Sequence, residues 1–154
     1  PRRRVLVLGA GGAGRAIAYG LKKSAAYVYV YNRDMKKAEA LADEFEINSI
    51  EYALIKKECN FDLIINATSV GSVPNTTESL LHANQIKKGS FVMDLVTNPL
   101  HTQLLKEAEK AGAEILTGER MLLHQAAGQF KIWFGKEAPL EVMEKAMYTE
   151  LKRR

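Results

Sequence analysis

Residues 5–14 have the sequence Val5-Leu6-Val7-Leu8-Gly9-Ala10-Gly11-Gly12-Ala13-Gly14. The first four form a short apolar run, which is typical of a parallel strand that is buried on both faces. The next six fit the pattern G-x-G-x-x-G, and residues 13–21 have the apolar spacing of a helix. The stretch therefore predicts a strand, a tight glycine loop and a helix in immediate succession.

The three glycines of the pattern meet three different physical demands. Gly9 permits the tight turn from strand to helix, Gly11 lets a ligand approach the backbone because it has no Cβ, and Gly14 lets the helix pack closely against the sheet. The helix N-terminus adds unpaired N–H groups and the positive end of the helix dipole. We therefore expect the loop to hold the pyrophosphate of a dinucleotide, and the alternative is a glycine-rich turn that binds nothing.

A second strand is predicted for residues 27–31, which contain only Tyr and Val. Domains that prefer NAD place an Asp or Glu at the tip of this strand, where it accepts hydrogen bonds from the ribose 2′-hydroxyl. Here the strand is followed by Asn32 and Arg33, and Lys37 lies one helical turn further on. Because the planar guanidinium of an arginine can pair with a 2′-phosphate, these residues favour NADP.

Asp34 leaves two interpretations open. It is a typical N-cap residue for the helix that we predict over residues 34–45. Alternatively, its carboxylate reaches a ribose hydroxyl and weakens the preference for NADP.

Strands and helices continue to alternate along the chain, which predicts an α/β fold with a doubly wound, Rossmann-type parallel sheet of about six strands. Residues 119–134 are helical by length but apolar nearly all round, so this helix needs cover on more than one side. We expect one domain, residues 1–154, in which residues 118–154 are C-terminal helices. The remaining elements are predicted as strands at residues 49–52, 63–65, 91–95 and 113–116 and as helices at residues 102–111 and 140–151.

A polar segment, Asn66-Ala67-Thr68-Ser69-Val70-Gly71, follows a central strand at its carboxyl end. This is the edge at which doubly wound sheets bind ligands. The hydroxyl groups of Thr68 and Ser69 either contact the cofactor or belong to a turn that closes on itself.

The bulk composition excludes several classes of protein. The chain has 154 residues, of which 47% are hydrophobic and 26% charged, as in an ordinary globular domain. The net charge of +4 invites a nucleic-acid interpretation, but six of the 22 basic residues lie at the two ends, in residues 2–4 and 152–154. Solvated termini explain these runs, and no nucleic-acid-binding motif lies between them. We therefore expect no nucleic-acid partner.

The single cysteine, Cys59, cannot form an internal disulfide, and its spacing to His82, His101 and His124 is not that of a metal site. No apolar run approaches the length of a membrane-spanning helix, and no signal peptide precedes the first strand, so we expect a cytoplasmic chain without membrane contact. The sequence begins with Pro1 and enters its first strand almost at once, so we expect it to be cut from a longer protein.

Taken together, these segments resemble shikimate dehydrogenase, and the resemblance runs from Val5 to Gly135. Two of the matching motifs, residues 94–102 and residues 118–127, belong to this family far more than to Rossmann domains in general. The matching stretches are residues 7–13, Asn32-Arg33 with Lys37-Ala38, residues 66–71, Asp94-Leu95-Val96-Thr97-Asn98-Pro99 with Thr102, and Gly118-Glu119-Arg120-Met121-Leu122 leading to Gln125-Ala126-Ala127.

The resemblance implies an enzyme with an N-terminal substrate domain, a C-terminal cofactor domain and a cleft between them. Such an enzyme reversibly reduces 3-dehydroshikimate to shikimate with NADPH, in the shikimate pathway of aromatic amino acid biosynthesis. By the resemblance, residues 9–13 hold the pyrophosphate, while the 2′-phosphate contacts Asn32, Arg33 and Lys37. The nicotinamide lies beside Leu95 and Gly118, and a substrate hydroxyl contacts Gln125. A glutamine amide suits this contact because it both donates and accepts, although the backbone could satisfy it instead.

Two departures from the family matter. Thr97 stands where the family usually has a Tyr near the substrate, so a hydroxyl is kept but its reach is shorter. The family's catalytic Lys and Asp belong to the N-terminal domain, so no residue of this chain is assigned a catalytic role, and we expect cofactor binding with little or no turnover. Residues 118–154 are expected to pack towards the missing substrate domain. Their apolar surface would favour a dimer if it is uncovered.

Three alternatives stay open at this point. The cofactor domain of glutamyl-tRNA reductase shares the glycine loop and the Asn-Arg pair, but it lacks the motif from Gly118 to Ala127. A quinate/shikimate dehydrogenase that prefers NAD is compatible with Asp34. A non-catalytic nucleotide-binding module is never excluded by fold alone, although Gln125 argues against it.

Overall fold

The computed structural model describes residues 3–24, 27–58 and 60–151. It divides into two compact units, residues 1–117 and residues 118–154. Cys59 and the basic residues Arg2, Lys152, Arg153 and Arg154 lie outside the described residues, and so do the predictions made for them.

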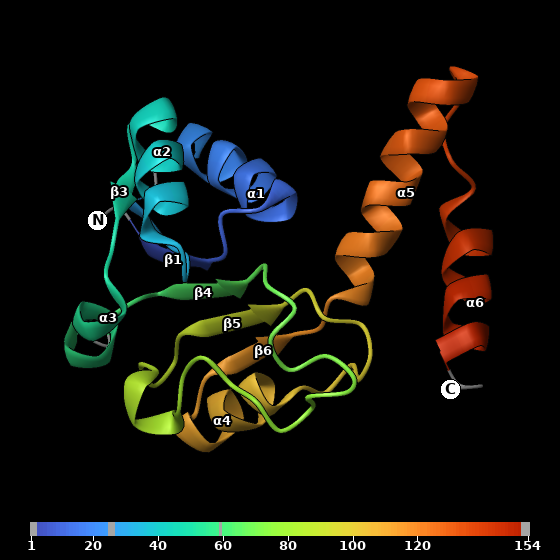
Figure 1. Ribbon diagram of the computed structural model, residues 1–154. Coiled ribbons are helices and arrows are strands. Elements are labelled where there is room, and N and C mark those ends of the chain that lie inside the picture. The colour runs from blue at the N-terminus through green and yellow to red at the C-terminus, as the bar shows by residue number, and fades with distance from the viewer. Residues whose placement is uncertain (1–2, 25–26, 59, 152–154) are drawn as a thin grey trace. The chain divides into compact units, whose positions relative to one another are not determined.

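In the first unit, strands alternate with helices along the chain (Figure 1). The described strands form one parallel sheet in the order β3-β2-β1-β4-β5-β6. The order reverses between β1 and β4, so the predicted doubly wound, six-stranded Rossmann-type sheet is confirmed. The elements are β1 (Arg4–Leu8), α1 (Gly12–Lys23), β2 (Tyr27–Tyr31), α2 (Met35–Phe45), β3 (Asn48–Ser49), α3 (Tyr52–Glu58), β4 (Leu63–Asn66), the 3-10 helix η1 (Ala83–Gln85), β5 (Phe91–Asp94), α4 (Gln103–Ala111) and β6 (Glu114–Leu116).

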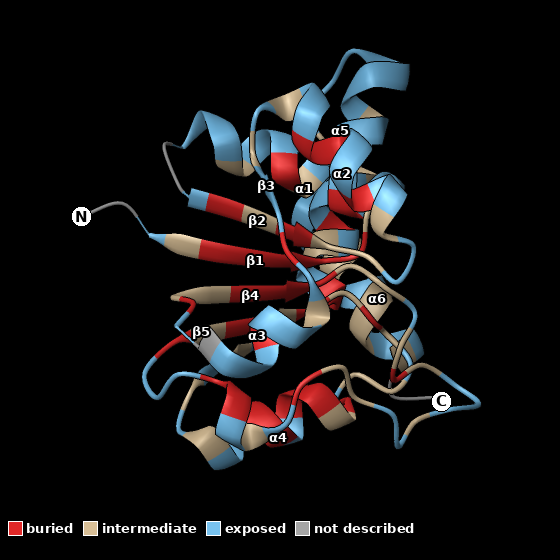
Figure 2. Ribbon diagram, turned by 60° about the vertical axis from the view of Figure 1, so that its left-hand side comes forward, coloured by how far each residue is buried: buried red, intermediate tan, exposed pale blue. Residues whose placement is uncertain are grey.

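Helices cover both faces of the sheet, and the central strands are buried between them (Figure 2). Because side chains alternate along a strand, β1 contributes Val7 to one core and Leu6 and Leu8 to the other. The first core packs against α1 and α2, and the second against α3 and α4. This two-sided burial explains why β1 and β4 are continuous apolar runs.

Three expectations for this unit need correction. Residues 49–52 do not form a strand: β3 ends at Ser49, and α3 begins at Tyr52. The sequence did not predict α3, because Ile55 is the one apolar residue of this short helix that is buried among the described ones, which is too weak a pattern to recognise. Arg4 is not a solvated terminal residue, since it belongs to β1 and its guanidinium lies 5.1 Å from the ring centre of Tyr29.

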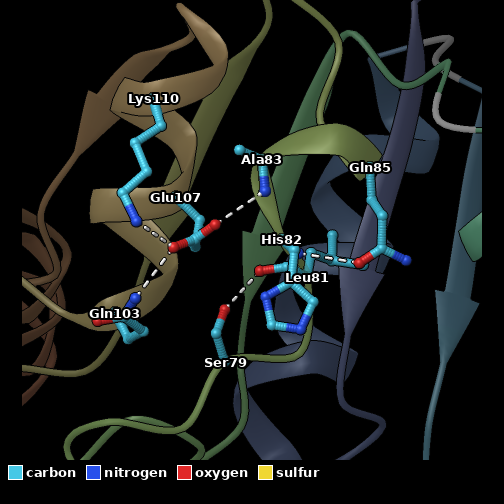
Figure 3. A network of polar contacts seen from close by, with 8 residues as sticks. All are labelled: Ser79, Leu81, His82, Ala83, Gln85, Gln103, Glu107 and Lys110. Carbon is cyan, nitrogen blue, oxygen red and sulfur yellow. Dashed lines mark hydrogen bonds and ion pairs between the residues drawn. The ribbon is translucent and has the colours of Figure 1, made fainter.

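Hydrogen bonds made by two polar residues, Thr102 and Glu107, fix the position of α4. Thr102 is its N-cap, and the Thr102 hydroxyl accepts a hydrogen bond from the Leu105 N–H. Glu107 is buried and accepts hydrogen bonds from the Ala83 N–H at 3.0 Å, from Gln103 Nε2 at 3.0 Å and from Lys110 Nζ at 2.7 Å (Figure 3). Glu107 thereby holds η1 against α4.

The second unit consists of α5 (Glu119–Phe134) and α6 (Leu140–Leu151), as predicted. Arg120 Nη1 donates to Glu144 Oε1 at 3.3 Å, which ties one helix to the other. Large apolar side chains at the end of α5 are exposed, with fractional exposures of 81% for Ile132, 72% for Trp133 and 61% for Phe134. This unit therefore leaves apolar surface open to a partner.

Surface and metal-site expectations can be compared with the described residues alone. His82, His101 and His124 are all exposed. Over the described ranges, no group of three or more His, Cys, Asp and Glu side chains is arranged to hold a metal ion. No helix in this part of the chain is both long enough and apolar enough to cross a membrane.

Candidate functional site

The glycine loop lies between β1 and α1, at the carboxyl edge of the sheet (Figure 1). Gly9 is buried with φ = +108°, and a Cβ there would lie 2.9 Å from Thr68 Cγ2. A Cβ on Gly14 would lie 1.9 Å from the Gly9 carbonyl oxygen. Side chains at these two positions would therefore force the loop, the helix and the neighbouring Asn66–Gly71 segment apart.

The N-terminus of α1 is open to an anion. Its N-cap is Gly11, which has no side chain to cap the first N–H groups, and the first turn contains no acidic residue. Gly11, Gly12 and Ala13 are exposed, and a Cβ on Gly11 or Gly12 would meet no atom within 4 Å among the described residues. Free N–H groups, a positive helix dipole and open space together fit a pyrophosphate.

Asn32 connects the end of β2 to this loop. Its Oδ1 accepts a hydrogen bond from the Ala10 N–H at 3.2 Å, and its Nδ2 donates to the Asp34 carbonyl at 3.0 Å. The Ala10 N–H is therefore engaged within the protein and does not add to the open N–H groups of α1. Asn32 keeps one amide hydrogen for a 2′-phosphate, so that contact stays a prediction.

Arg33 and Lys37 are the cations of the site. Both are exposed, and neither side chain forms a hydrogen bond or an ion pair with another described residue. Arg33 follows the end of β2 and Lys37 lies in the first turn of α2, and two such uncommitted positive charges complement the charge of a phosphate group.

Asp34 occupies the N-cap position of α2, but its side chain makes no capping hydrogen bond. Thr102, which does cap α4, has ψ = 168°, whereas Asp34 has ψ = 99°. Asp34 therefore occupies the predicted N-cap position, but the expected capping hydrogen bond from its side chain is not formed. The side chain is exposed.

The segment that follows β4 closes on itself. Asn66 is buried, and its Oδ1 accepts hydrogen bonds from the Thr68 N–H at 3.0 Å and from the Thr68 hydroxyl at 2.6 Å. The Thr68 hydroxyl in turn accepts from the Val70 N–H at 3.1 Å. The one hydroxyl proton of Thr68 is therefore committed to the turn, whereas Ser69 is exposed.

A pocket of about 360 Å³ opens between this segment and the loop that follows β5. Four of the predicted site residues line it together: Thr68 and Ser69 on one wall, Leu95 and Thr97 on the other. The Val73 N–H donates to the Asn98 carbonyl at 3.1 Å and joins the two walls. The remaining lining residues are Ser72, Val73, Val96 and Asn98.

Asp94, to which the sequence assigned no role, directly precedes the lining residue Leu95 and accepts a hydrogen bond from the N–H of the lining residue Val96. It is fully buried at the end of β5 and pairs in register with Asn66 at the end of β4. Burial raises the pKa of its carboxyl group, against the opposing effect of hydrogen bonds from Thr102, Val96 and Asn66. A sequence pattern could have indicated this pair: two apolar strands each end in a polar residue. Parallel strands bring their carboxyl ends to the same edge of a sheet, so such residues lie close together.

Gly118 and Gln125 belong to the second unit. Gly118 is the buried N-cap of α5, and Gln125 is exposed on the same helix. The structure therefore groups the residues predicted for the pyrophosphate, the 2′-phosphate and the pocket in the first unit, while the roles of Gly118 and Gln125 stay predictions.

Comparisons with known proteins show the family to which this chain is similar. The family model of shikimate / quinate 5-dehydrogenase matches residues 1–108, and that of the shikimate 5′-dehydrogenase C-terminal domain matches residues 118–148. A shikimate dehydrogenase (NADP(+)) from Methanococcus maripaludis is 40% identical over 157 residues, which cover 97% of this chain and 56% of that protein.

Solved structures show the same likeness. Shikimate 5-dehydrogenase from Thermus thermophilus, in complex with NADP(H) and shikimate, has a TM-score of 0.85 at 36% identity, over 96% of this chain and 55% of that one. Quinate dehydrogenase from Corynebacterium glutamicum, in complex with NAD, has a TM-score of 0.87 at 29% identity, over 97% and 56%. The chain spans a little over half the length of these relatives.

Proposed function

Because the chain belongs to the shikimate/quinate 5-dehydrogenase family, we propose that it is the NADP(H)-binding part of an NADP-dependent shikimate dehydrogenase. The whole enzyme would reduce 3-dehydroshikimate reversibly to shikimate. When bound, the nicotinamide supplies the hydride, and the residues of this chain bind and orient the two ends of the cofactor.

Two observations support the proposal: the N-terminus of α1 has no side-chain cap, and two exposed cations, Arg33 and Lys37, follow β2 in the loop and in the first turn of α2. The N–H groups at Gly12 and Ala13 would hold the pyrophosphate, for which the glycine loop leaves space. Arg33 and Lys37, both exposed and uncommitted, would hold the 2′-phosphate that distinguishes NADP from NAD.

The pocket at the ends of β4 and β5 would receive the nicotinamide end. Leu95 offers an apolar wall for the ring, and Thr97 and Ser69 offer hydroxyl groups. We assign Gly118 to the nicotinamide and Gln125 to a substrate hydroxyl because both lie within the second family match. Thr97 would contact the substrate at shorter reach than a Tyr.

Residues 1–154 contain no residue that we assign to proton transfer. The curated relatives are longer, since this chain covers 56% of the Methanococcus maripaludis protein. We propose that the catalytic Lys and Asp belong to a substrate domain outside these residues, and that residues 118–154 pack against it. The exposed Ile132, Trp133 and Phe134 support such a docking role and would favour a dimer of the isolated chain.

A second candidate is a quinate/shikimate dehydrogenase of the same family that prefers NAD. The free carboxylate of Asp34 favours it, because an acidic side chain at this edge can accept a hydrogen bond from a ribose 2′-hydroxyl and repels a 2′-phosphate. If so, Asp34→Asn should raise the affinity for NADPH and lower that for NADH, with thermal stability unchanged.

The test of the proposed function is to titrate the purified chain with NADP⁺ and then to add shikimate or quinate while the absorbance of NADPH is followed. We expect saturable binding with little or no turnover. Rapid reduction of NADP⁺ by shikimate would contradict the assignment of catalysis to residues outside 1–154. A folded chain that binds neither NADP⁺ nor NADPH would contradict the proposed function itself.

A further inference from the structure

Asp94 sits at the junction of three segments. It is fully buried at the last position of β5, directly before the residues that form one wall of the pocket. Its Oδ1 accepts hydrogen bonds from Asn66 Nδ2 at 2.9 Å and from the Val96 N–H at 3.0 Å. Its Oδ2 accepts from the Thr102 hydroxyl at 2.7 Å. One carboxylate therefore joins β4, the loop after β5 and the start of α4.

These bonds extend into both walls of the pocket. On one side, Asn66 uses its second amide hydrogen to donate to the Val70 carbonyl at 3.2 Å, and its oxygen holds Thr68. On the other side, the N–H that donates to Asp94 belongs to Val96, which lines the pocket. A continuous series of hydrogen bonds thus runs from Thr68 through Asn66 and Asp94 to Val96.

A carboxylate is the group that suits this junction. When ionised, it accepts from all three donors and brings no donor of its own, so every proton at the junction has an acceptor. Hydrogen bonds to a charged acceptor are roughly twice as strong as neutral ones, which stiffens the two walls. A buried charge is otherwise unfavourable, and its presence next to the lining residues of a pocket calls for a reason beyond packing.

We propose that Asp94 is a positioning residue: by holding Asn66, Val96 and Thr102 together, it fixes the two walls of the pocket and so sets the affinity for the nicotinamide end of the cofactor, which it does not touch. This inference rests on the proposed function, since it takes the pocket to be the nicotinamide site.

The chain contains a matched control. Glu107 is likewise a buried carboxylate of the first unit that accepts three hydrogen bonds, here from Ala83, Gln103 and Lys110 (Figure 3). None of these described partners lines the pocket. A merely structural role for Asp94 would make Asp94→Ala and Glu107→Ala behave alike, whereas a positioning role separates them.

The experiment compares two probes on the folded chain and its variants by calorimetry. NADPH occupies the whole site, whereas adenosine 2′,5′-bisphosphate carries only the adenosine end. For Asp94→Ala we expect NADPH affinity to fall at least tenfold and bisphosphate affinity to change less than twofold. The rise in nicotinamide fluorescence on binding should shrink as well. Asp94→Asn, which keeps the shape and two acceptor bonds, should restore most of the NADPH affinity. Glu107→Ala should leave both affinities within twofold.

Equal losses for both probes in Asp94→Ala would overturn the proposal, and so would an NADPH loss in Glu107→Ala as large as in Asp94→Ala. If Asp94→Ala does not fold, Asn66→Ala cuts the same connection from the opposite wall and must give the same selective loss of NADPH affinity. Unaltered NADPH affinity in that variant overturns the proposal. Failure of the wild-type chain to bind either probe is a separate outcome, which overturns the proposed function.

Discussion

Asn32 Oδ1 accepts a hydrogen bond from the Ala10 N–H at 3.2 Å, across 22 residues of sequence. The residue directly after β2 thereby holds the glycine loop that follows β1. The adenosine end and the pyrophosphate end of the site are therefore parts of one hydrogen-bonded structure, and a change at Asn32 should be felt at both.

Asn32→Ala removes this hydrogen bond to the loop and should weaken both NADPH and NADH, each by at least about fivefold, since one net hydrogen bond is worth about 1 kcal/mol. The predicted contact of Asn32 with the 2′-phosphate would add to the loss for NADPH alone. Calorimetric titration with both nucleotides checks this. Asn48→Ala, which removes an amide bonded to the Val28 carbonyl, is the control and should leave both affinities unchanged. A loss confined to NADPH would mean that Asn32 acts only on the 2′-phosphate.

Arg33→Gln should act on one nucleotide alone. It removes an exposed charge without breaking any hydrogen bond or ion pair between described residues, so thermal stability should stay the same. We expect NADPH affinity to fall about tenfold, or about 1.4 kcal/mol, with NADH affinity unchanged. Lys36→Gln is the matched control, because it removes an exposed charge one residue before Lys37. Equal effects of the two variants would show a general electrostatic attraction and no specific phosphate contact.

Two glycines of the loop should respond differently to alanine. A Cβ on Gly14 would lie 1.9 Å from the Gly9 carbonyl oxygen, so Gly14→Ala must displace backbone and should lower the free energy of unfolding by about 1–3 kcal/mol. A Cβ on Gly11 would meet no described atom within 4 Å, so Gly11→Ala should fold with nearly wild-type stability. It should nevertheless weaken NADPH binding about tenfold, because the methyl group would occupy the space of the pyrophosphate.

Denaturant unfolding and calorimetry on the same two variants separate the effects. A Gly11→Ala protein that binds NADPH normally would place the pyrophosphate elsewhere. A Gly14→Ala protein with unaltered stability would contradict the close contact between α1 and the loop.

The stability of the first unit should depend on pH through the ionisation of Asp94. Burial raises the pKa of its carboxyl group, so the folded protein keeps this proton to higher pH than the unfolded chain does. The folded state therefore binds more protons, and the contribution of Asp94 to stability falls as pH rises through the window between its ordinary and its raised pKa. Above that window the contribution stays constant.

Carboxyl groups with a lowered pKa, such as Asp62 and Glu107, make stability increase with pH. They do so equally in the wild type and in Asp94→Asn, so the difference in stability between the two proteins isolates the effect of Asp94. The stability of the wild type relative to Asp94→Asn, measured by denaturant unfolding, should decrease from about pH 4 towards neutrality. A difference that is flat or increases with pH would contradict the raised pKa.

The sequence predicted the parts of the fold that rest on local patterns. Continuous apolar runs marked β1 and β4, and G-x-G-x-x-G marked the turn into α1, because each pattern has few other physical explanations. It missed α3, whose burial depends on Ile55 packing against distant residues of the second core. It left Asp34 open between a helix cap and a ribose contact, because no sequence pattern shows whether a side chain at the N-cap position makes the capping hydrogen bond.

In the site, too, residues in local motifs could be predicted, whereas contacts between distant residues could not. Thr68 and Ser69 were expected at the carboxyl edge of the sheet, and the family resemblance assigned Leu95 to the nicotinamide and Thr97 to the substrate. All four line one pocket. The role of Asn32 in holding the glycine loop and of Asp94 as a junction could not be predicted, since both depend on contacts between residues far apart in the sequence. The pairing of Asn66 with Asp94 requires the register of two strands, which only the assembled sheet provides.

We propose that the glycine loop and Arg33 form a site for NADP(H). Parallel calorimetric titrations of the chain with NADPH and NADH distinguish this site from its alternatives. We expect clear binding of NADPH, with NADH at least tenfold weaker, a difference of about 1.4 kcal/mol or more. Equal affinities would contradict the assignment of Arg33 and shift the ribose contact to Asp34. A folded chain that binds neither nucleotide would contradict the claim altogether.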